Sequence, residues 1–213
     1  MLNLSRTSTV LLEGLRDPTN SEAWETFDQL YRPVVIGFAR RLGLADADAA
    51  DIAQETMAQF VQEYRADRYD RTRGRLRTWL IALAKSRIAV LRRSDSRRRH
   101  WRGDSALVDL ANESELTRIW EDERRATALR HAMDQLREKT RAHDKTIQAF
   151  ELVVVNRVPA PAVAKELGMT THDVYLAKGR IAHMLRGILR SIDAAFDDVP
   201  AGASAALGAQ PSC

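Results

Sequence analysis

Residues 46–102 read DADAADIAQETMAQFVQEYRADRYDRTRGRLRTWLIALAKSRIAVLRRSDSRRRHWR, and they change from acidic to basic along their length. The first part, residues 46–63, carries five acidic residues and no Lys or Arg. The last part, residues 85–102, carries eight basic residues against one acidic residue. One part of this stretch therefore repels polyanions, while the other concentrates positive charge as a nucleic-acid site does.

Apolar residues recur at helical spacing in both parts of this stretch. They are Ile52, Met57, Phe60, Val61 and Tyr64 in the acidic part, and Leu76, Trp79, Leu80, Leu83, Ala84, Ile88 and Leu91 in the basic part. The pattern predicts two amphipathic helices joined by an irregular loop over residues 65–74, which contains Tyr69. We expect the second helix to fray near Ser94.

The composition limits the class of protein. The chain has 213 residues, of which 45% are hydrophobic, and a formal net charge of +4, as is usual for a globular protein with an apolar core. Its one cysteine, Cys213, excludes an intramolecular disulfide and a thiolate-cluster zinc site, and fits a reducing compartment. No apolar run is long enough for a signal peptide or a membrane span. We therefore expect a cytoplasmic protein without membrane insertion.

Helical patterns also precede the central stretch. Residues 1–20 predict a lead segment with a helical turn over Val10–Leu15. From Trp24 to Leu42 the apolar residues have helical spacing, with Pro33 as a kink or break. Ser21 is expected to cap this helix, and Asp46 or Asp48 the acidic one, because short polar side chains accept hydrogen bonds from a first helical turn.

Helical patterns return after a gap. Residues 94–112 lack a sustained period and predict an interdomain linker. A helix is predicted from about Glu115 to Lys139 and another over Thr146–Asn156, although Val153–Val155 has the propensity of a strand. From about Asp197 the chain is rich in Ala, Gly, Ser and Pro, which predicts a disordered tail.

Residues 160–179, APAVAKELGMTTHDVYLAKG, fit the template of a helix-turn-helix. Ala164 is the small residue where the two helices meet, and Gly168 stands at the turn, where a positive φ is commonly needed. Thr170 and Asp173 have the spacing of a capping box at the start of the second helix. The core positions of this motif are Val163, Leu167, Met169 and Val174.

Three motifs together carry a family resemblance. DIAQET at residues 51–56, the YD-containing loop and RTWLIALAKSRI at residues 77–88 resemble region 2 of the extracytoplasmic-function group of bacterial sigma-70 factors. The helix-turn-helix follows where that family has region 4. The resemblance covers roughly residues 21–95 and 115–192, and it implies a subunit that binds RNA polymerase core, recognises the minus-10 and minus-35 promoter elements and helps to open the DNA.

The resemblance also implies an all-α fold of two helical domains joined by a flexible linker. The lead segment comprises residues 1–20, the region 2-like domain residues 21–95 and the linker residues 96–114. The region 4-like helix-turn-helix domain comprises residues 115–194, and the disordered tail residues 195–213.

Site residues follow from the positions that match the family, in which the acidic helix binds the clamp coiled coil of the beta-prime subunit. For core-polymerase binding they are Asp48, Asp51, Gln54 and Glu55. For minus-10 DNA they are Tyr69, Arg71, Arg73, Arg75, Arg77, Lys85, Arg92 and Arg93, whereas Trp79 and Leu80 are expected in the core. For minus-35 DNA they are Thr171, His172, Tyr175, Lys178 and Arg180. The implied partners are the clamp coiled coil and the beta flap of RNA polymerase core, promoter DNA, and, as a further candidate, an anti-sigma factor.

The sequence contains no motif of an enzyme active site. It has no phosphate loop, no HExxH and no glycine-rich nucleotide fingerprint, and its five histidines lack metal-ligand spacing. We therefore expect neither catalysis, nor a cofactor, nor a metal. Two other functions stay open: a helix-turn-helix regulator that never binds core polymerase, which leaves DIAQET unexplained, and a helical hydrolase using Asp48 and Asp51, which lacks a metal partner or a base.

Overall fold

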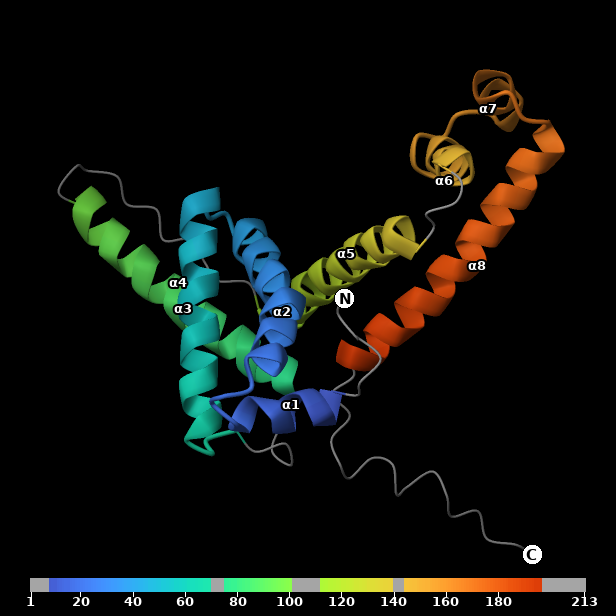
Figure 1. Cartoon of the computed structure of the whole chain (residues 1–213). Coiled ribbons are helices and arrows are strands. Elements are labelled where there is room, and N and C mark those ends of the chain that lie inside the picture. Colours follow the sequence, from blue (N-terminus) through green and yellow to red (C-terminus); the bar gives the residue numbers. More distant parts are fainter. Residues whose placement is uncertain (1–7, 70–74, 101–111, 140–143, 197–213) are drawn as a thin grey trace, which may run out of the picture. The chain divides into compact units, whose positions relative to one another are not determined.

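The computed structural model describes residues 8–69, 75–100, 112–139 and 144–196 (Figure 1). All regular structure among these residues is helical, which confirms the predicted all-α class. The elements are α1 Ser8–Arg16, α2 Ser21–Arg41, α3 Asp46–Arg65, α4 Leu76–His100, α5 Glu113–Lys139, α6 Asp144–Phe150, the π-helical turn η1 Glu151–Val155, α7 Ala160–Leu167 and α8 Thr171–Phe196. No helix in this described part of the chain is long and apolar enough to cross a membrane.

The chain divides into two compact units, unit 1 (Met1–Thr127 with Phe196–Cys213) and unit 2 (Ala128–Ala195). The boundary between the units lies inside α5, after Thr127. The sequence prediction had the second domain begin at residue 115. The reason is packing: Trp120, in the first half of α5, is 1% exposed and meets the ring of Phe38 edge-on, with 5.7 Å between the ring centroids. Residues 115–127 therefore complete the core of unit 1.

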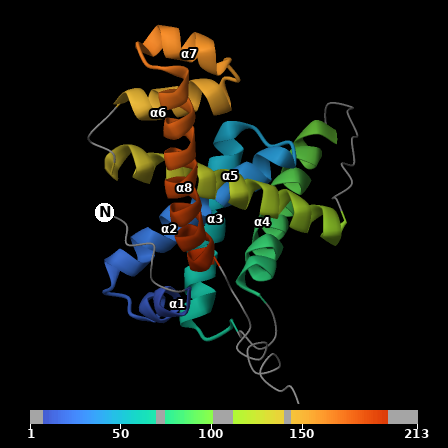
Figure 2. The ribbon, with the colours of Figure 1, turned by 90° about the vertical axis from the view of Figure 1, so that its right-hand side faces the viewer.

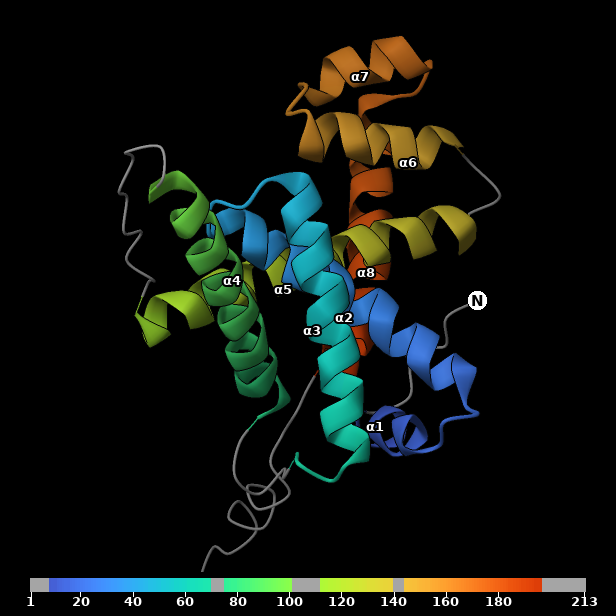
Figure 3. The ribbon, with the colours of Figure 1, turned by 90° about the vertical axis from the view of Figure 1, so that its left-hand side faces the viewer.

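Unit 1 is built on the packing of α2, α3 and α4, with α1 against α2 and α3. Figure 3 shows α3 crossing α2, with α4 along one side of α3. The rings of Phe27 from α2 and Phe60 from α3 stack with centroids 4.6 Å apart, and both are fully buried. Tyr64 donates a hydrogen bond of 2.7 Å from its hydroxyl to the backbone oxygen of Leu12, which attaches α1 to α3. The helical turn expected over Val10–Leu15 is confirmed as α1.

The helix starts in unit 1 differ in detail from the sequence prediction. Asn20, not Ser21, caps α2, and its side-chain oxygen accepts from the backbone nitrogen of Ala23 at 3.0 Å. The N-cap of α3 is Ala45, which makes no side-chain cap, so neither Asp46 nor Asp48 is the cap residue. Both carboxylates lie in the first turn instead, where the helix dipole favours negative charge.

Two predicted breaks are absent. Helix α2 continues through Pro33, because its neighbours Leu30 and Val34 are buried in the core and hold the backbone in place. Helix α4 continues past Ser94 to His100, so residues 97–99 are helical rather than an irregular basic run. Neither Gly nor Pro occurs between residues 75 and 100, and Arg is a good helix former. Residues 101–111 of the predicted linker and residues 197–213 of the predicted tail lie outside the described residues.

Unit 2 contains the helix-turn-helix formed by α7 and α8, with α6 packed beside α7 (Figure 2). Its core is small: Ala149, Val163, Ala164, Val174 and Ala177 are among the buried side chains. Three of these five residues are alanines, whose small side chains permit neighbouring helices to pack closely. Residues 151–155 are helical as predicted, although as a π-helical turn.

The turn between α7 and α8 confirms the predicted chemistry of this motif. Gly168 ends α7 in the left-handed conformation at φ +61°, which favours glycine. The hydroxyl of Thr170 accepts from the backbone nitrogen of Asp173 at 3.1 Å and donates to its carboxylate at 2.6 Å. The carboxylate in turn accepts from the backbone nitrogen of Thr170 at 3.3 Å. This reciprocal pairing is a capping box.

Candidate functional site

The acidic face of α3, formed by Asp48, Asp51, Gln54 and Glu55, is available to a partner. Three of these side chains are exposed, and Asp48 is half-buried. Positions 48, 51 and 55 are three and four residues apart, so they lie on one side of the helix. The opposite side of α3 is buried in unit 1, which leaves the carboxylates directed to the surface.

One end of this acidic face is paired with α4. Arg87 lies 3.5 Å from the carboxylate of Glu55 and donates to the side-chain oxygen of Gln59 at 2.8 Å. Solvent screens this ion pair, because the Glu55 side chain is 56% exposed. Arg87 therefore orients the Glu55 side chain more than it neutralises the negative charge of its carboxylate. Asp51, by contrast, lies at the exposed centre of the face.

Tyr69, the predicted aromatic contact to minus-10 DNA, lies in an aromatic stack. Its ring is parallel to that of Trp79 within 8°, with centroids 4.9 Å apart, and Trp79 meets Phe60 edge-on at 5.4 Å. Tyr69 and Trp79 are half-buried, and Leu80 is fully buried. The core thus sets the position of Tyr69. Arg71 and Arg73 lie outside the described residues.

The other predicted minus-10 residues differ in their exposure and in the hydrogen bonds that they make within the protein. Arg75 is exposed and Lys85 is half-buried on α4. Arg93 is exposed and donates to the backbone oxygen of Ala89, one turn earlier, at 3.1 Å. Arg92 donates from Nη2 to the backbone oxygen of Leu42 and so joins α4 to the end of α2. Its first role is therefore structural.

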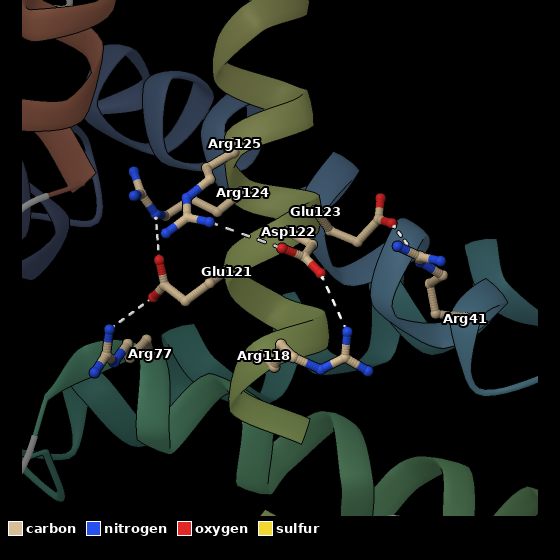
Figure 4. Close-up of polar contacts among 8 residues, drawn as sticks. All are labelled: Arg41, Arg77, Arg118, Glu121, Asp122, Glu123, Arg124 and Arg125. Carbon is tan, nitrogen blue, oxygen red and sulfur yellow. Dashed lines mark hydrogen bonds and ion pairs between the residues drawn. The ribbon is translucent and has the colours of Figure 1, made fainter. Parts of the chain in front are cut away.

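Arg77 belongs to a network of ion pairs that runs along α5 (Figure 4). Its Nη1 lies 2.6 Å from one carboxylate oxygen of Glu121, and Nε of Arg124 lies 3.0 Å from the other. Partial burial alone would raise the pKa of Glu121, but the hydrogen bonds and charges of Arg124 and Arg77 outweigh it and hold the pKa below its usual value. Glu121 is therefore a charged carboxylate with a cation on each oxygen.

The same helix makes two further sets of pairs. Glu123 accepts from Nε of Arg41 on α2 at 3.2 Å. Asp122 pairs with both Arg118 and Arg125 within α5 itself (Figure 4), and each N–O distance is 3.8 Å. Our sequence prediction did not include this network. Only the pairs within α5 had a signal in the sequence, the run EDERR at residues 121–125, in which Glu121 and Asp122 each stand three positions before an arginine, the spacing of neighbours on a helix.

The predicted minus-35 residues lie together at the start of α8. Thr171, His172, Tyr175, Lys178 and Arg180 are all exposed. Between them, Val174 and Ala177 are buried in the core of unit 2, so the helix has one inner and one outer side. The hydrogen bond from the Thr170 hydroxyl, followed by that from its backbone nitrogen, holds the pKa of Asp173 below its usual value. The first turn of α8 is thereby fixed.

Comparison with known families assigns one part of this arrangement. Residues 27–100 match the family model of Sigma-70 region 2. The match supports sigma factor function in general, and such function implies RNA polymerase core and promoter DNA as partners. No curated protein matches the chain.

The Sigma-70 region 2 match contains both the acidic face and the predicted minus-10 residues from Tyr69 to Arg93. The helix-turn-helix lies outside it, so its assignment as region 4 stays a prediction. Glu121 also lies outside the match, yet it binds Arg77 within it. Among the described residues, no group of three or more His, Cys, Asp or Glu side chains could hold a metal ion.

Proposed function

We propose that this protein is a sigma factor of the extracytoplasmic-function type. In this role it acts in the cytoplasm, binds RNA polymerase core and directs it to promoters, while the chemistry of RNA synthesis belongs to the polymerase. One observation carries the proposal: within residues 27–100, which match Sigma-70 region 2, the acidic residues Asp51 and Glu55 are exposed on one side of α3.

The acidic face of α3 is the proposed contact to core polymerase. Exposed carboxylates suit a basic partner helix, such as the clamp coiled coil, because charge complementarity accelerates encounter and fixes register. Buried Ala49, Ile52 and Ala53 anchor α3 from the other side, so the face does not need to reorganise when it binds.

Two basic surfaces are the proposed contacts to promoter DNA. In unit 1, Arg75, Arg77, Lys85 and Arg93 supply phosphate contacts, and the Tyr69 ring a stacking surface for an unpaired base. In unit 2, the exposed side chains at the start of α8 face outward on a capped helix, the usual geometry of a recognition helix in the major groove. Tyr175, 57% exposed, is the largest of them.

The test of core binding is charge reversal on α3, Asp51→Arg with Glu55→Arg. Glu22→Arg with Glu25→Arg on α2 is the matched control, because both glutamates are exposed and the net change of charge is the same. We expect the α3 variant to lose binding to core polymerase and transcription from promoters selected out of a library, with its circular dichroism unchanged, because surface substitutions usually cost within about 0.5 kcal/mol.

The control variant should bind core polymerase and support transcription. If the α3 variant bound core with unchanged affinity, the acidic face would not be the polymerase contact. A protein that shifts duplex DNA but never binds core would instead be a helix-turn-helix regulator.

The test of the minus-35 surface uses promoters selected in that experiment. Tyr175→Ala and Lys178→Ala should lower holoenzyme affinity for the selected duplex by roughly 1–3 kcal/mol and for a scrambled minus-35 duplex much less. Arg186→Ala, exposed further along α8, is the control. Equal losses on both duplexes would exclude a base-reading role for Tyr175 and Lys178.

A further inference from the structure

Glu121 on α5 binds one of the cations that the proposed function assigns to DNA. Arg77 stands on the first turn of α4, within the region 2 match, and its Nη1 lies 2.6 Å from Glu121. The side chain of Arg77 is 35% exposed and that of Glu121 20% exposed. Both residues belong to unit 1, so this contact lies inside one compact unit.

The first half of α5 holds Glu121 in place through the residues on either side of it. Trp120 is 1% exposed against Phe38. Glu123 pairs with Arg41 and occupies the space beside Gly37, where an added Cβ would lie 2.1 Å from its carboxylate. The position of Glu121 thus follows from an apolar contact and a steric fit that do not involve Arg77.

The charge balance at Arg77 favours competition with nucleic acid. A phosphate bound at this guanidinium lies close to the carboxylate of Glu121, so the two anions repel each other and compete for the same positive charge. The pair is partly exposed, so its own strength is modest and a phosphate can displace it. Figure 4 shows the carboxylate of Glu121 between Arg77 and Arg124, with each oxygen directed at one of them.

We propose that Glu121 withholds Arg77 from DNA in the free protein, so that the first half of α5 acts as an internal competitor of the nucleic acid. This inference rests on the proposed function, in which Arg77 contacts the minus-10 strand. It adds a regulatory step to that function: binding of DNA at Arg77 requires the Glu121 pair to open. A change that moves α5 away from α4 then increases affinity for single-stranded DNA.

Glu121→Gln in the full chain tests this directly. The variant removes the charge but retains the shape of the side chain. The probe is a fluorescein-labelled oligodeoxythymidylate of about 15 nucleotides, which suits the question because phosphate contacts do not depend on sequence. One additional phosphate contact to a single strand steepens the salt slope by about 0.7, which corresponds to about fivefold in affinity between about 1 M and about 0.1 M salt. We expect this steeper slope and about fivefold tighter binding at the lower salt.

Two controls separate the specific effect from a general gain of positive charge. Asp122→Asn removes the same charge one position along α5, where the partners are Arg118 and Arg125 and not a residue of α4. It should leave affinity nearly unchanged. The second control repeats Glu121→Gln in an Arg77→Ala background, where the gain should disappear, because no cation remains at position 77 to be released.

The outcomes also distinguish this inference from the proposed function. Arg77→Ala alone should change the affinity and the salt slope little, because Glu121 already holds Arg77 away from the nucleic acid. If Arg77→Ala alone weakens binding and makes the slope shallower while Glu121→Gln brings no gain, the withholding role is wrong and the DNA role of Arg77 stands. If neither substitution changes binding, or if neither the wild type nor Glu121→Gln binds the probe at about 50 mM salt, both assignments are wrong. A gain that persists without Arg77 would identify Arg124, the second partner of Glu121, as the released cation and would likewise overturn the proposal.

Discussion

Replacing Thr170 by alanine measures how much the capping box contributes to the helix-turn-helix. The change removes the hydroxyl that accepts from the backbone nitrogen of Asp173 at 3.1 Å and donates to its carboxylate at 2.6 Å. Loss of a threonine N-cap typically costs about 1 kcal/mol. For a compact unit of the size of Ala128–Ala195, this lowers the melting temperature by about 4–8 °C.

The assay is hydrogen exchange of the α7 and α8 amides in the full chain, because it reports on unit 2 alone, together with the thermal transition of that unit. Thr171→Ala is the matched control: it is the neighbouring exposed threonine, and it follows the cap residue. If both variants lowered protection equally, the capping box would not stabilise α8. A double variant with Asp173→Ala should lose less than the sum of its single changes, since each residue needs the other.

Three further measurements test other parts of the structure. Thr170 holds the pKa of Asp173 below its ordinary value. The ionised Asp173 carboxylate therefore stabilises the fold fully above the pKa of the unfolded carboxyl, and this stabilisation is lost as pH falls through the folded pKa. Acid should lower amide protection at the start of α8 in the wild type and not in Asp173→Asn. Trp120→Ala should cost about 3–5 kcal/mol of unfolding free energy in urea, whereas Leu129→Ala, 49% exposed on the same helix, should cost far less. Arg92→Ala should cost about 1 kcal/mol more than Arg93→Ala by the same method, because it alone loses the bond to the Leu42 oxygen.

Local chemistry made the helix-turn-helix predictable from sequence. Gly168 and the Thr170–Asp173 pair act within a few residues of one another, so spacing alone indicates them. The acidic side of α3 was equally visible, because the buried positions of a helix leave the remaining positions to solvent. Cap identity was less predictable: Asn20 and Ser21 are adjacent and both suit a cap, and only the backbone conformation selects Asn20.

Contacts between distant parts of the chain could not be predicted in this way. Glu121 is 44 residues beyond Arg77, and nothing in the period of either helix indicates that they meet. The basic residues of α4 appeared equivalent in sequence, yet Arg77 and Arg92 are engaged by Glu121 and by the Leu42 backbone. The extension of α4 to His100 was missed because a run of charged residues was interpreted as a linker, although arginines favour helix.

The stack of Tyr69 on Trp79 gives the protein an optical reporter of its own. The Trp79 indole stacks on the Tyr69 ring and is half-buried. Its fluorescence therefore changes when another group takes the place of the Tyr69 ring or of the solvent beside it. A base inserted against this pair would quench the indole, since stacked nucleobases and aromatic side chains share their π-faces. The chain has four tryptophans, so titration with unlabelled oligonucleotide, followed through tryptophan fluorescence and compared between the wild type and Trp79→Phe, would thus report occupancy beside the start of α4 without a chemical label.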